Sequence, residues 1–295
     1  MEKIVNILTD SPCCPLCENE ATVFFAKKNN INIYKCQKCK FVFVFPEIKD
    51  LAKIYNSDYF HGGKGDFGYA DYDGDKKNLL ENFKKYTDKI ELFSKKKGKL
   101  LDVGAATGIF VESVNDRGWD AQGIDISLDA TLLGKNKQLK LMTGEFEDYN
   151  FGNDFFDVIT FWDVLEHFPH PEKALKKADK ILKKNGIIAI NTPNASSVVA
   201  KIFGKKWHLL VPPEHLNYFS PGNIESILSK NGFTVLYIGR IRKKFSLQYI
   251  FKILSRWQKF SLWKWIYSYL SKNRLGKINL TIDTSDNMFI IAKKN

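Results

Sequence analysis

The stretch from Lys99 to Val114 restricts the possible folds of this chain more than any other part. It begins with apolar residues, passes into a loop of small residues that includes Gly104 and Gly108, and continues with an amphipathic pattern. Glycine permits a tight turn and lets a ligand approach the backbone closely. The stretch therefore predicts a strand, a ligand-binding loop and a helix in succession.

A second strand is expected to end at an acidic residue. Residues 120–125 read Asp-Ala-Gln-Gly-Ile-Asp, and Asp125 lies 23 residues beyond Asp102. In nucleoside-binding βαβ units, a strand-end carboxylate at about this distance binds a ribose. The loop and the acid together predict an α/β domain that binds a nucleoside-containing cofactor. The loop lacks the Gly-x-Gly-x-x-Gly pattern of a Rossmann dehydrogenase.

These residues resemble the class I S-adenosylmethionine-dependent methyltransferases, whose first motif usually reads Leu-Asp-Val-Gly-x-Gly-x-Gly. Ala106 stands here at the middle glycine, and the later motifs match in order at residues 144–147, 156–167 and 182–194. The resemblance covers about residues 95–295. It implies a Rossmann-like α/β fold with a seven-stranded, mostly parallel sheet and an antiparallel last strand.

The resemblance also implies how S-adenosylmethionine is bound. Asp102 and the loop from Gly104 to Gly108 would surround the methionine end, and Asp125 would bind the ribose hydroxyls. Another two residues would lie near the adenine. The full set of cofactor-binding residues predicted in this way is Asp102, Gly104, Ala105, Gly108, Asp125, Glu145, Phe146 and Trp162.

All five cysteines lie within the first 39 residues. Cys14 and Cys17 form one C-x2-C pair, Cys36 and Cys39 form another, and 18 residues separate the two pairs. This spacing is typical of a structural zinc site, in which four thiolates leave no open position for water. Cys13 fits the spacing less well. The alternatives are unrelated buried thiols or two disulfides, and disulfides are disfavoured because no secretory signal is found.

The sequence divides into three predicted parts. A zinc ribbon occupies about residues 1–45, a helical lid or linker about 46–92, and the methyltransferase domain 93–295. By resemblance, Tyr69 and Tyr72 in the lid would touch cofactor or substrate, whereas a disordered linker is the alternative. No stretch approaches the ~18 apolar residues of a membrane span. We therefore expect a cytoplasmic protein.

The segment after the fifth predicted strand looks like that of small-molecule methyltransferases. Their subfamily includes sugar C-methyltransferases with an N-terminal cysteine zinc module, in which an adjacent Glu-His pair is associated with proton removal. The match implies catalytic roles for Glu214 and His215, with a packing role for His215 as the alternative. Pro212 stands where the C-methylating enzymes have a tyrosine, which disfavours C-methylation. His167 is predicted to be structural.

Most of the net charge of +12 is found near the C-terminus, where residues 240–295 hold 13 Lys or Arg and two Asp. Within about 245–272, apolar residues and tryptophans repeat at helical spacing. We predict a helical insert here that lines the pocket or forms a dimer contact. The alternative is a peripheral segment on a membrane surface.

These patterns predict methyl transfer from S-adenosylmethionine to a small, sugar-containing metabolite, on oxygen or carbon, with the help of a general base. The runner-up is a ribosomal or transfer RNA methyltransferase whose ribbon and basic tail bind phosphates. Its affinity for RNA would fall steeply with salt. A third possibility is a cofactor-binding regulatory protein without turnover.

Overall fold

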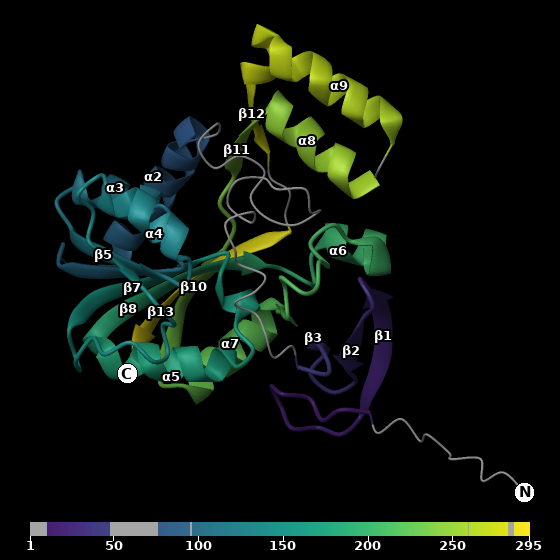
Figure 1. Ribbon diagram of the computed structural model, residues 1–295. Coiled ribbons are helices and arrows are strands. Elements are labelled where there is room, and N and C mark those ends of the chain that lie inside the picture. The colour runs from purple at the N-terminus through teal and green to yellow at the C-terminus, as the bar shows by residue number, and fades with distance from the viewer. Residues whose placement is uncertain (1–10, 48–75, 95, 259, 283–285) are drawn as a thin grey trace, which may run out of the picture.

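The computed structural model describes residues 11–47, 76–94, 96–258, 260–282 and 286–295. Its centre is a seven-stranded sheet (Figure 1). In spatial order the strands are β10 (Phe233–Gly239), β13 (Asn287–Lys294), β8 (Leu182–Pro193), β7 (Phe156–Trp162), β4 (Lys99–Val103), β5 (Asp120–Asp125) and β6 (Leu141–Thr143). The strands from β8 to β6 are parallel, and β13 is antiparallel to both of its neighbours. The predicted fold class is confirmed.

The direction of the strands fixes where loops can meet. Because β13 is antiparallel to β8 and to β10, β10 runs in the same direction as β8. The loops that follow β4, β5, β7, β8 and β10 therefore leave the sheet at one edge. In open α/β sheets, ligands bind outside the carboxyl ends of the parallel strands. We call this side the carboxyl edge.

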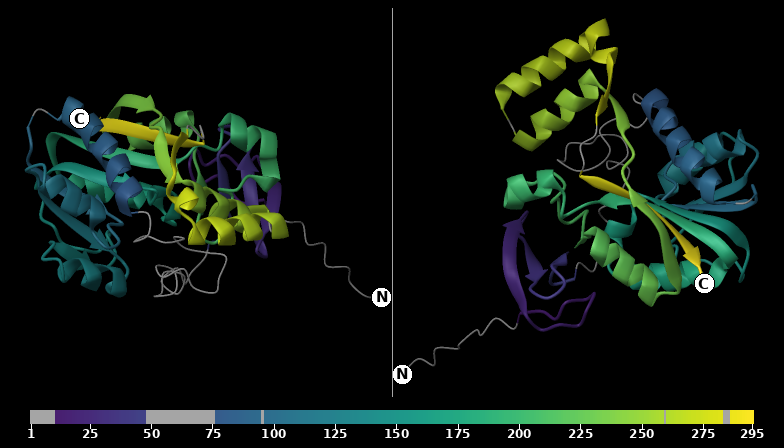
Figure 2. Two further views of the ribbon diagram at one scale, coloured as in Figure 1. Left: turned by 90° about the horizontal axis from the view of Figure 1, so that it is seen from above. Right: turned by 180° about the vertical axis from the view of Figure 1, so that it is seen from behind.

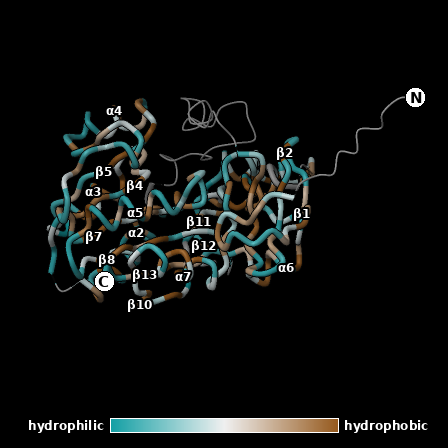
Figure 3. The backbone as a smooth tube through the Cα atoms, turned by 90° about the horizontal axis from the view of Figure 1, so that it is seen from below, coloured by the Kyte–Doolittle hydropathy of each residue, from teal (hydrophilic) through white to brown (hydrophobic). Residues whose placement is uncertain are grey.

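The central strands are apolar because helices cover both faces of the sheet. Hydrophobic residues run along β7 and β13 (Figure 3). On one face lie α2 (Lys76–Phe93) and α3 (Ile109–Asn115), which bury Ile90 and Phe110. On the other face lie α5 (Pro171–Ile181) and α7 (Pro221–Lys230), which bury Leu175 and Leu228. The remaining helical segments near the sheet are α4 (Leu128–Lys135), α6 (Val198–Phe203), η2 (Leu165–His167) and η3 (Gly204–Lys206).

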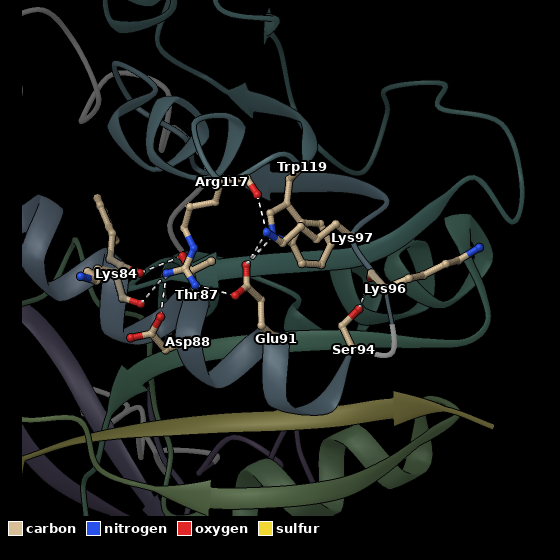
Figure 4. Close-up of polar contacts among 10 residues, drawn as sticks. Lys84, Thr87, Asp88, Glu91, Ser94, Lys96, Lys97, Arg117 and Trp119 are labelled. Carbon is tan, nitrogen blue, oxygen red and sulfur yellow. Dashed lines mark hydrogen bonds and ion pairs between the residues drawn. The ribbon is translucent and has the colours of Figure 1, made fainter.

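A cluster of charged residues fixes α2 against the start of β5 (Figure 4). Arg117 Nη1 lies 2.7 Å from Asp88 Oδ1, and Arg117 Nη2 lies 2.5 Å from Glu91 Oε2. The indole of Trp119 donates to the other oxygen of Glu91 at 3.2 Å. Residues 76–92 of the predicted lid thus belong to α2, which packs on the sheet, whereas Tyr69 and Tyr72 lie outside the described residues.

A second sheet joins the N-terminal residues to the rest of the chain. Its strands are β1 (Thr22–Lys28), β2 (Ile31–Cys36), β3 (Val42–Val44) and β9 (Asn217–Tyr218). The first three form an antiparallel ribbon, and β9 comes from the segment after β8. Phe41 packs against Phe219 with ring centroids 5.3 Å apart. The ribbon therefore shares a hydrophobic core with the helices that cover the large sheet.

A helical hairpin follows β10 and projects beyond the sheet and its flanking helices (Figures 1 and 2). It consists of α8 (Leu247–Gln258), α9 (Ser261–Lys272) and the short η4 (Arg274–Lys277). A two-stranded sheet of β11 (Lys243–Ser246) and β12 (Asn279–Ile282) connects it to the body. Among the described residues, no helix is both long and apolar enough to cross a membrane.

Candidate active site

The loop after β4 has the backbone conformation of a ligand-binding turn. Gly104 and Gly108 have φ values of +73° and +79°, in the left-handed region that glycine favours. A Cβ on Gly104 would lie 2.4 Å from Val164 Cγ2, so a side chain does not fit there. Ala106 replaces the middle glycine of the motif and still adopts a φ of +47°. The replacement therefore keeps the shape of the loop at some cost in backbone strain.

Asp125, at the end of β5, is tied to this loop. Its Oδ2 accepts a hydrogen bond from the amide of Ala106, and its Oδ1 accepts one from the amide of Ser127, both at 2.8 Å. Each carboxylate oxygen has further lone pairs, so both can still accept from a ligand hydroxyl. Burial raises the pKa of the Asp125 carboxyl, and the two amides lower it. The arrangement fits the predicted ribose-binding role.

Asp102 and Thr107 are two further buried polar residues, one in β4 and one in the loop that follows it. Asp102 Oδ1 accepts a 2.7 Å hydrogen bond from the hydroxyl of Thr160. Thr107, between Ala106 and Gly108, has a buried hydroxyl with no hydrogen-bond partner within the described part of the chain. Because an unpaired buried hydroxyl costs free energy, a polar ligand seated on the loop would stabilise it. This orphaned hydroxyl supports a bound cofactor.

The other predicted cofactor residues differ in their burial. Ala105 is buried under the loop, and Glu145 is exposed after β6. The Phe146 ring is buried against Phe161, with centroids 5.7 Å apart. Trp162 stacks on Phe289 at 5.7 Å and has a buried indole N–H with no partner among the described residues. The rings of Phe146 and Trp162 are thus in contact with other aromatic side chains of the core. Their contact with a cofactor stays a prediction.

His215 is buried in the segment between η3 and β9. Its Nδ1 lies 2.8 Å from the carbonyl oxygen of Leu209. Since a carbonyl oxygen only accepts, Nδ1 carries the proton and Nε2 carries the lone pair. The carbonyl of Leu209 thus sets the tautomer of His215, and the catalytic role of Glu214 stays a prediction. Burial lowers the pKa of His215 to about 4.

His167 lies beside His215, with ring centroids 4.9 Å apart. Burial lowers its pKa far below the usual value, and its ring hydrogen-bonds to the backbone at Asp163 and Glu214. The fully buried Glu166 accepts a 2.9 Å hydrogen bond from Thr192. The structure therefore brings the loops after β7 and β8 together around one neutral histidine pair.

The ribbon holds the segment that carries His215. Lys28 Nζ donates to the carbonyls of Trp207 and Leu210 at 3.3 and 2.8 Å, and Asn29 Nδ2 donates to Pro212 at 2.7 Å. The amide of Val44 donates to the carbonyl of Leu216 at 2.9 Å. The backbone on both sides of His215 is therefore fixed from the N-terminal sheet.

Four cysteines gather at one end of the ribbon. One ligand atom from each of Cys14, Cys17, Cys36 and Cys39 lies within 4.8 Å of the others. The Sγ atoms of Cys14 and Cys39 are 3.6 Å apart, as are those of Cys17 and Cys36. Tetrahedral zinc with Zn–S bonds of ~2.3 Å separates its sulfurs by about 3.8 Å. Cys13 is exposed and outside the cluster, so the cluster consists of the predicted two pairs.

The environment of the cluster differs from one thiol to the next. Burial raises the pKa of the Cys14 thiol to about 11 and raises that of Cys39 as well. Burial also acts on Cys36, but hydrogen bonds with the backbone of Cys39 and Lys38 lower its pKa to about 7. A divalent cation would stabilise all four as thiolates, so this donor set fits zinc.

Two functional candidates were missed by the sequence analysis. His208 Nε2 lies 3.2 Å from Oδ2 of Asp286, a carboxylate that is almost fully buried. A positive charge on His208 also lowers the pKa of His215, although burial is the larger cause. Glu166 is the second candidate. His208 and Asp286 are far apart in the sequence and belong to no motif, so only the fold could reveal the pair.

Asp102→Asn tests whether burial keeps the carboxyl of Asp102 protonated in the folded chain. The pKa of Asp102 is raised to about 8, mainly by burial, with a smaller lowering by the hydrogen bond from Thr160 and a smaller raising by the charge of Asp125. Between about pH 4 and 8, the folded chain holds a proton that the unfolded chain has released, so the free energy of unfolding falls as pH rises. Asparagine cannot ionise. We expect Asp102→Asn to be more stable than the parent at pH ~8.5 by about 1–3 kcal/mol.

Urea unfolding of the ligand-free protein between pH 5 and 9 measures this difference. The exposed Asp148→Asn is the matched control and should follow the parent at every pH. Equal pH dependence in Asp102→Asn and the parent would show that Asp102 is ionised in the folded state.

Comparisons with known proteins identify the family of the chain. The family described as "Methyltransferase domain" matches residues 79–238, more than half of the chain. A ubiquinone biosynthesis O-methyltransferase of Glaesserella parasuis is 30% identical over 134 residues, which are 41% of this chain and 57% of that protein. An uncharacterised protein of Methanocaldococcus jannaschii is 27% identical over 150 residues, or 50% of this chain and 71% of that protein.

Solved structures show the same fold. A SAM-dependent methyltransferase from Archaeoglobus fulgidus superposes with a TM-score of 0.52 at 19% identity and covers 74% of this chain and 94% of its own. The glycine loop, the acid at the end of β5 and the family match lead to one conclusion. The chain belongs to the methyltransferase-domain family and is an S-adenosylmethionine-dependent methyltransferase.

Proposed function

We propose that the enzyme methylates a hydroxyl, or a carbon that can lose a proton, on a small sugar-containing acceptor, with His215 as the general base. One observation carries this proposal. His215 is buried among the loops of the carboxyl edge, and its Nδ1–H is held by Leu209 so that Nε2 can accept a proton. A hydroxyl becomes a good nucleophile when its proton leaves during methyl transfer.

S-adenosylmethionine supplies an electrophilic methyl group when it is bound. Asp125 would accept hydrogen bonds from its ribose hydroxyls, and the loop from Gly104 to Gly108 would lie against its methionine part. The unpartnered hydroxyl of Thr107 offers one more polar contact. Each of these groups belongs to the carboxyl edge, where β4 and β5 end.

The low pKa of His215 shapes the proposed chemistry. With a pKa near 4, the imidazole is neutral across the physiological range, so the base is always in its active form. The same value makes it a weak base. It serves best if proton removal accompanies methyl transfer, because free alkoxide would be too basic to form first. His167 lies beside it, with the two ring planes at 85° to each other.

Two kinds of support favour a small acceptor. Several relatives are named as O-methyltransferases of ubiquinone biosynthesis. In addition, the proposed base is buried, and a small acceptor reaches a buried side chain more readily than a folded RNA does. The test measures S-adenosylhomocysteine release with panels of sugar nucleotides, glycosides and transfer RNA. Turnover with RNA alone, lost steeply with salt, would contradict the proposal.

We also propose that the four-cysteine cluster binds one structural zinc ion. The ion would hold the two cysteine pairs together. Helix α7 contacts one of these pairs through Asn223, whose side chain donates to the carbonyl of Cys39 at 2.9 Å. Zinc would thereby act on catalysis only through the ribbon, which fixes the backbone around His215.

Asp125→Ala removes the acceptor for the ribose hydroxyls. A hydrogen bond to a charged group contributes ~1.5–3 kcal/mol, so affinity for S-adenosylmethionine should fall at least about tenfold. Isothermal titration calorimetry gives the dissociation constant. The nearby, exposed Asp129→Ala should remain within about twofold of the parent. An unchanged affinity in Asp125→Ala would reject this position for the ribose.

Cys36→Ser should release the zinc and loosen the ribbon. Metal analysis should find about one zinc per chain in the parent and much less in the variant. Turnover should drop more than affinity for S-adenosylmethionine, because the ribbon contacts the His215 segment and not the glycine loop. The exposed Cys13→Ser controls for loss of a thiol. Freshly purified parent protein without zinc would refute the metal site.

His215→Ala should bind S-adenosylmethionine as the parent does and lower kcat by about 10²–10⁴, the usual contribution of a general base. In the parent, kcat/KM should decline only below about pH 5, since the proton is gained near pH 4 and not near 6.5. His170→Ala, at a half-exposed histidine on the surface, is the matched control. A loss below threefold in His215→Ala would assign this histidine to packing.

A further inference from the structure

We propose that the hairpin of α8 and α9 docks the enzyme on the surface of an anionic phospholipid bilayer. The docking surface consists of the outer face of α9 and the basic residues around it. It is separate from the candidate active site, and the proposal does not depend on the acceptor.

The charge of this segment has one sign. Residues 243–282 contain nine Lys or Arg and no Asp or Glu. On the described part of the hairpin, the side chains of Lys264, Lys272, Arg274 and Lys277 are exposed. Such a run attracts an anionic surface, and each basic residue near a phospholipid head group raises the partition roughly fivefold.

The outer face of α9 is apolar as well. Leu262, Trp265 and Tyr269 are 57%, 67% and 50% exposed, and their spacing places them on one side of the helix. The rings of Trp265 and Tyr269 stack with centroids 6.1 Å apart. An exposed stripe of this kind is costly in water but suits the boundary between head groups and acyl chains.

The opposite face of α9 is already used. Trp263 packs against Phe251 of α8 with centroids 5.6 Å apart, and Leu270 is buried. The contact between the two helices therefore leaves the stripe of Leu262, Trp265 and Tyr269 outside. Packing within the hairpin does not explain why these large residues face outward.

Charge complementarity selects the bilayer over the other occupants. A second copy of the chain would bring an equally basic hairpin against this one, and like charges would oppose the contact. A nucleic acid would suit the charge and its bases could stack on Trp265 and Tyr269, but it would leave the exposed aliphatic residues Leu262, Leu275 and Ile278 without an apolar partner. Aromatic and aliphatic residues bordered by lysine are typical of helices that lie in a lipid interface.

The hairpin is positioned by its connection to the body. The amide of Lys244 in β11 donates to Asn82 Oδ1 on α2 at 2.8 Å, and Lys244 also pairs with Glu81. The insert leaves from the end of β10, which lies on the carboxyl edge. Docking would thus hold this edge of the sheet near the bilayer (Figure 2).

Cosedimentation with vesicles tests the proposal. The full chain should bind vesicles of equal parts phosphatidylglycerol and phosphatidylcholine, and high salt should release it because surface charge is screened. Leu262→Ser with Trp265→Ser, and separately Lys264→Glu with Lys272→Glu, should each lower the partition coefficient at least about tenfold. These side chains are exposed, so circular dichroism should show both variants folded. Leu92→Ser, at an apolar side chain that is 74% exposed on α2, should bind as the parent does.

Several results would overturn the proposal. Failure of the parent chain to bind the anionic vesicles would do so, and so would equal binding to vesicles of pure phosphatidylcholine. Unchanged binding of either double variant would also refute it. Sedimentation equilibrium that shows a dimer, lost in Leu262→Ser with Trp265→Ser and unaccompanied by vesicle binding, would assign the stripe to a second copy. Binding to RNA but not to vesicles would assign it to nucleic acid.

Discussion

The antiparallel pairing of β3 with β9 is the interaction on which the candidate active site depends. Val42 pairs with Tyr218 and Phe43 with Asn217, and β9 directly follows His215 in the chain. Leu216 connects both sides: its carbonyl accepts from Val44 in the ribbon, and its amide donates to the carbonyl of Glu166 in η2. The cysteine module and the loop after β7 therefore fix the same backbone.

A different interaction fixes the glycine loop: the carboxylate of Asp125 accepts hydrogen bonds from two backbone amides. This carboxylate shapes the loop and also faces the place where the motif predicts a ribose. Burial acts against its charge, and the amides stabilise it. A cofactor hydroxyl would add to an existing network, so little reorganisation accompanies binding. Preorganisation of this kind favours affinity because fewer groups must be ordered on binding.

Much of this could be predicted from local patterns. The strand, loop and helix between Lys99 and Val114 and the two cysteine pairs follow from short motifs whose residues lie close together in the chain. The partners of His215 could not be predicted in this way, because Leu209 holds the ring through a backbone carbonyl that has no sequence signature. The hydrogen bonds from Lys28 to the carbonyls of Trp207 and Leu210 join residues that are far apart in the sequence, so they become visible only in the folded chain. The exposed stripe on α9 could not be predicted either, because apolar residues at helical spacing do not show which face of the helix packs against the protein.

The carboxyl edge brings these separate parts into one arrangement. The glycine loop follows β4, Asp125 ends β5, His167 follows β7, and the His215 segment follows β8. The strands before these segments are parallel, so their carboxyl ends lie at the same edge. Segments that are far apart in the sequence are therefore brought to one edge of the sheet. The insert leaves from β10 at this same edge. The candidate cofactor loop, the proposed base and the insert therefore all follow strands that end at one edge of the sheet, although the hairpin itself projects beyond the sheet.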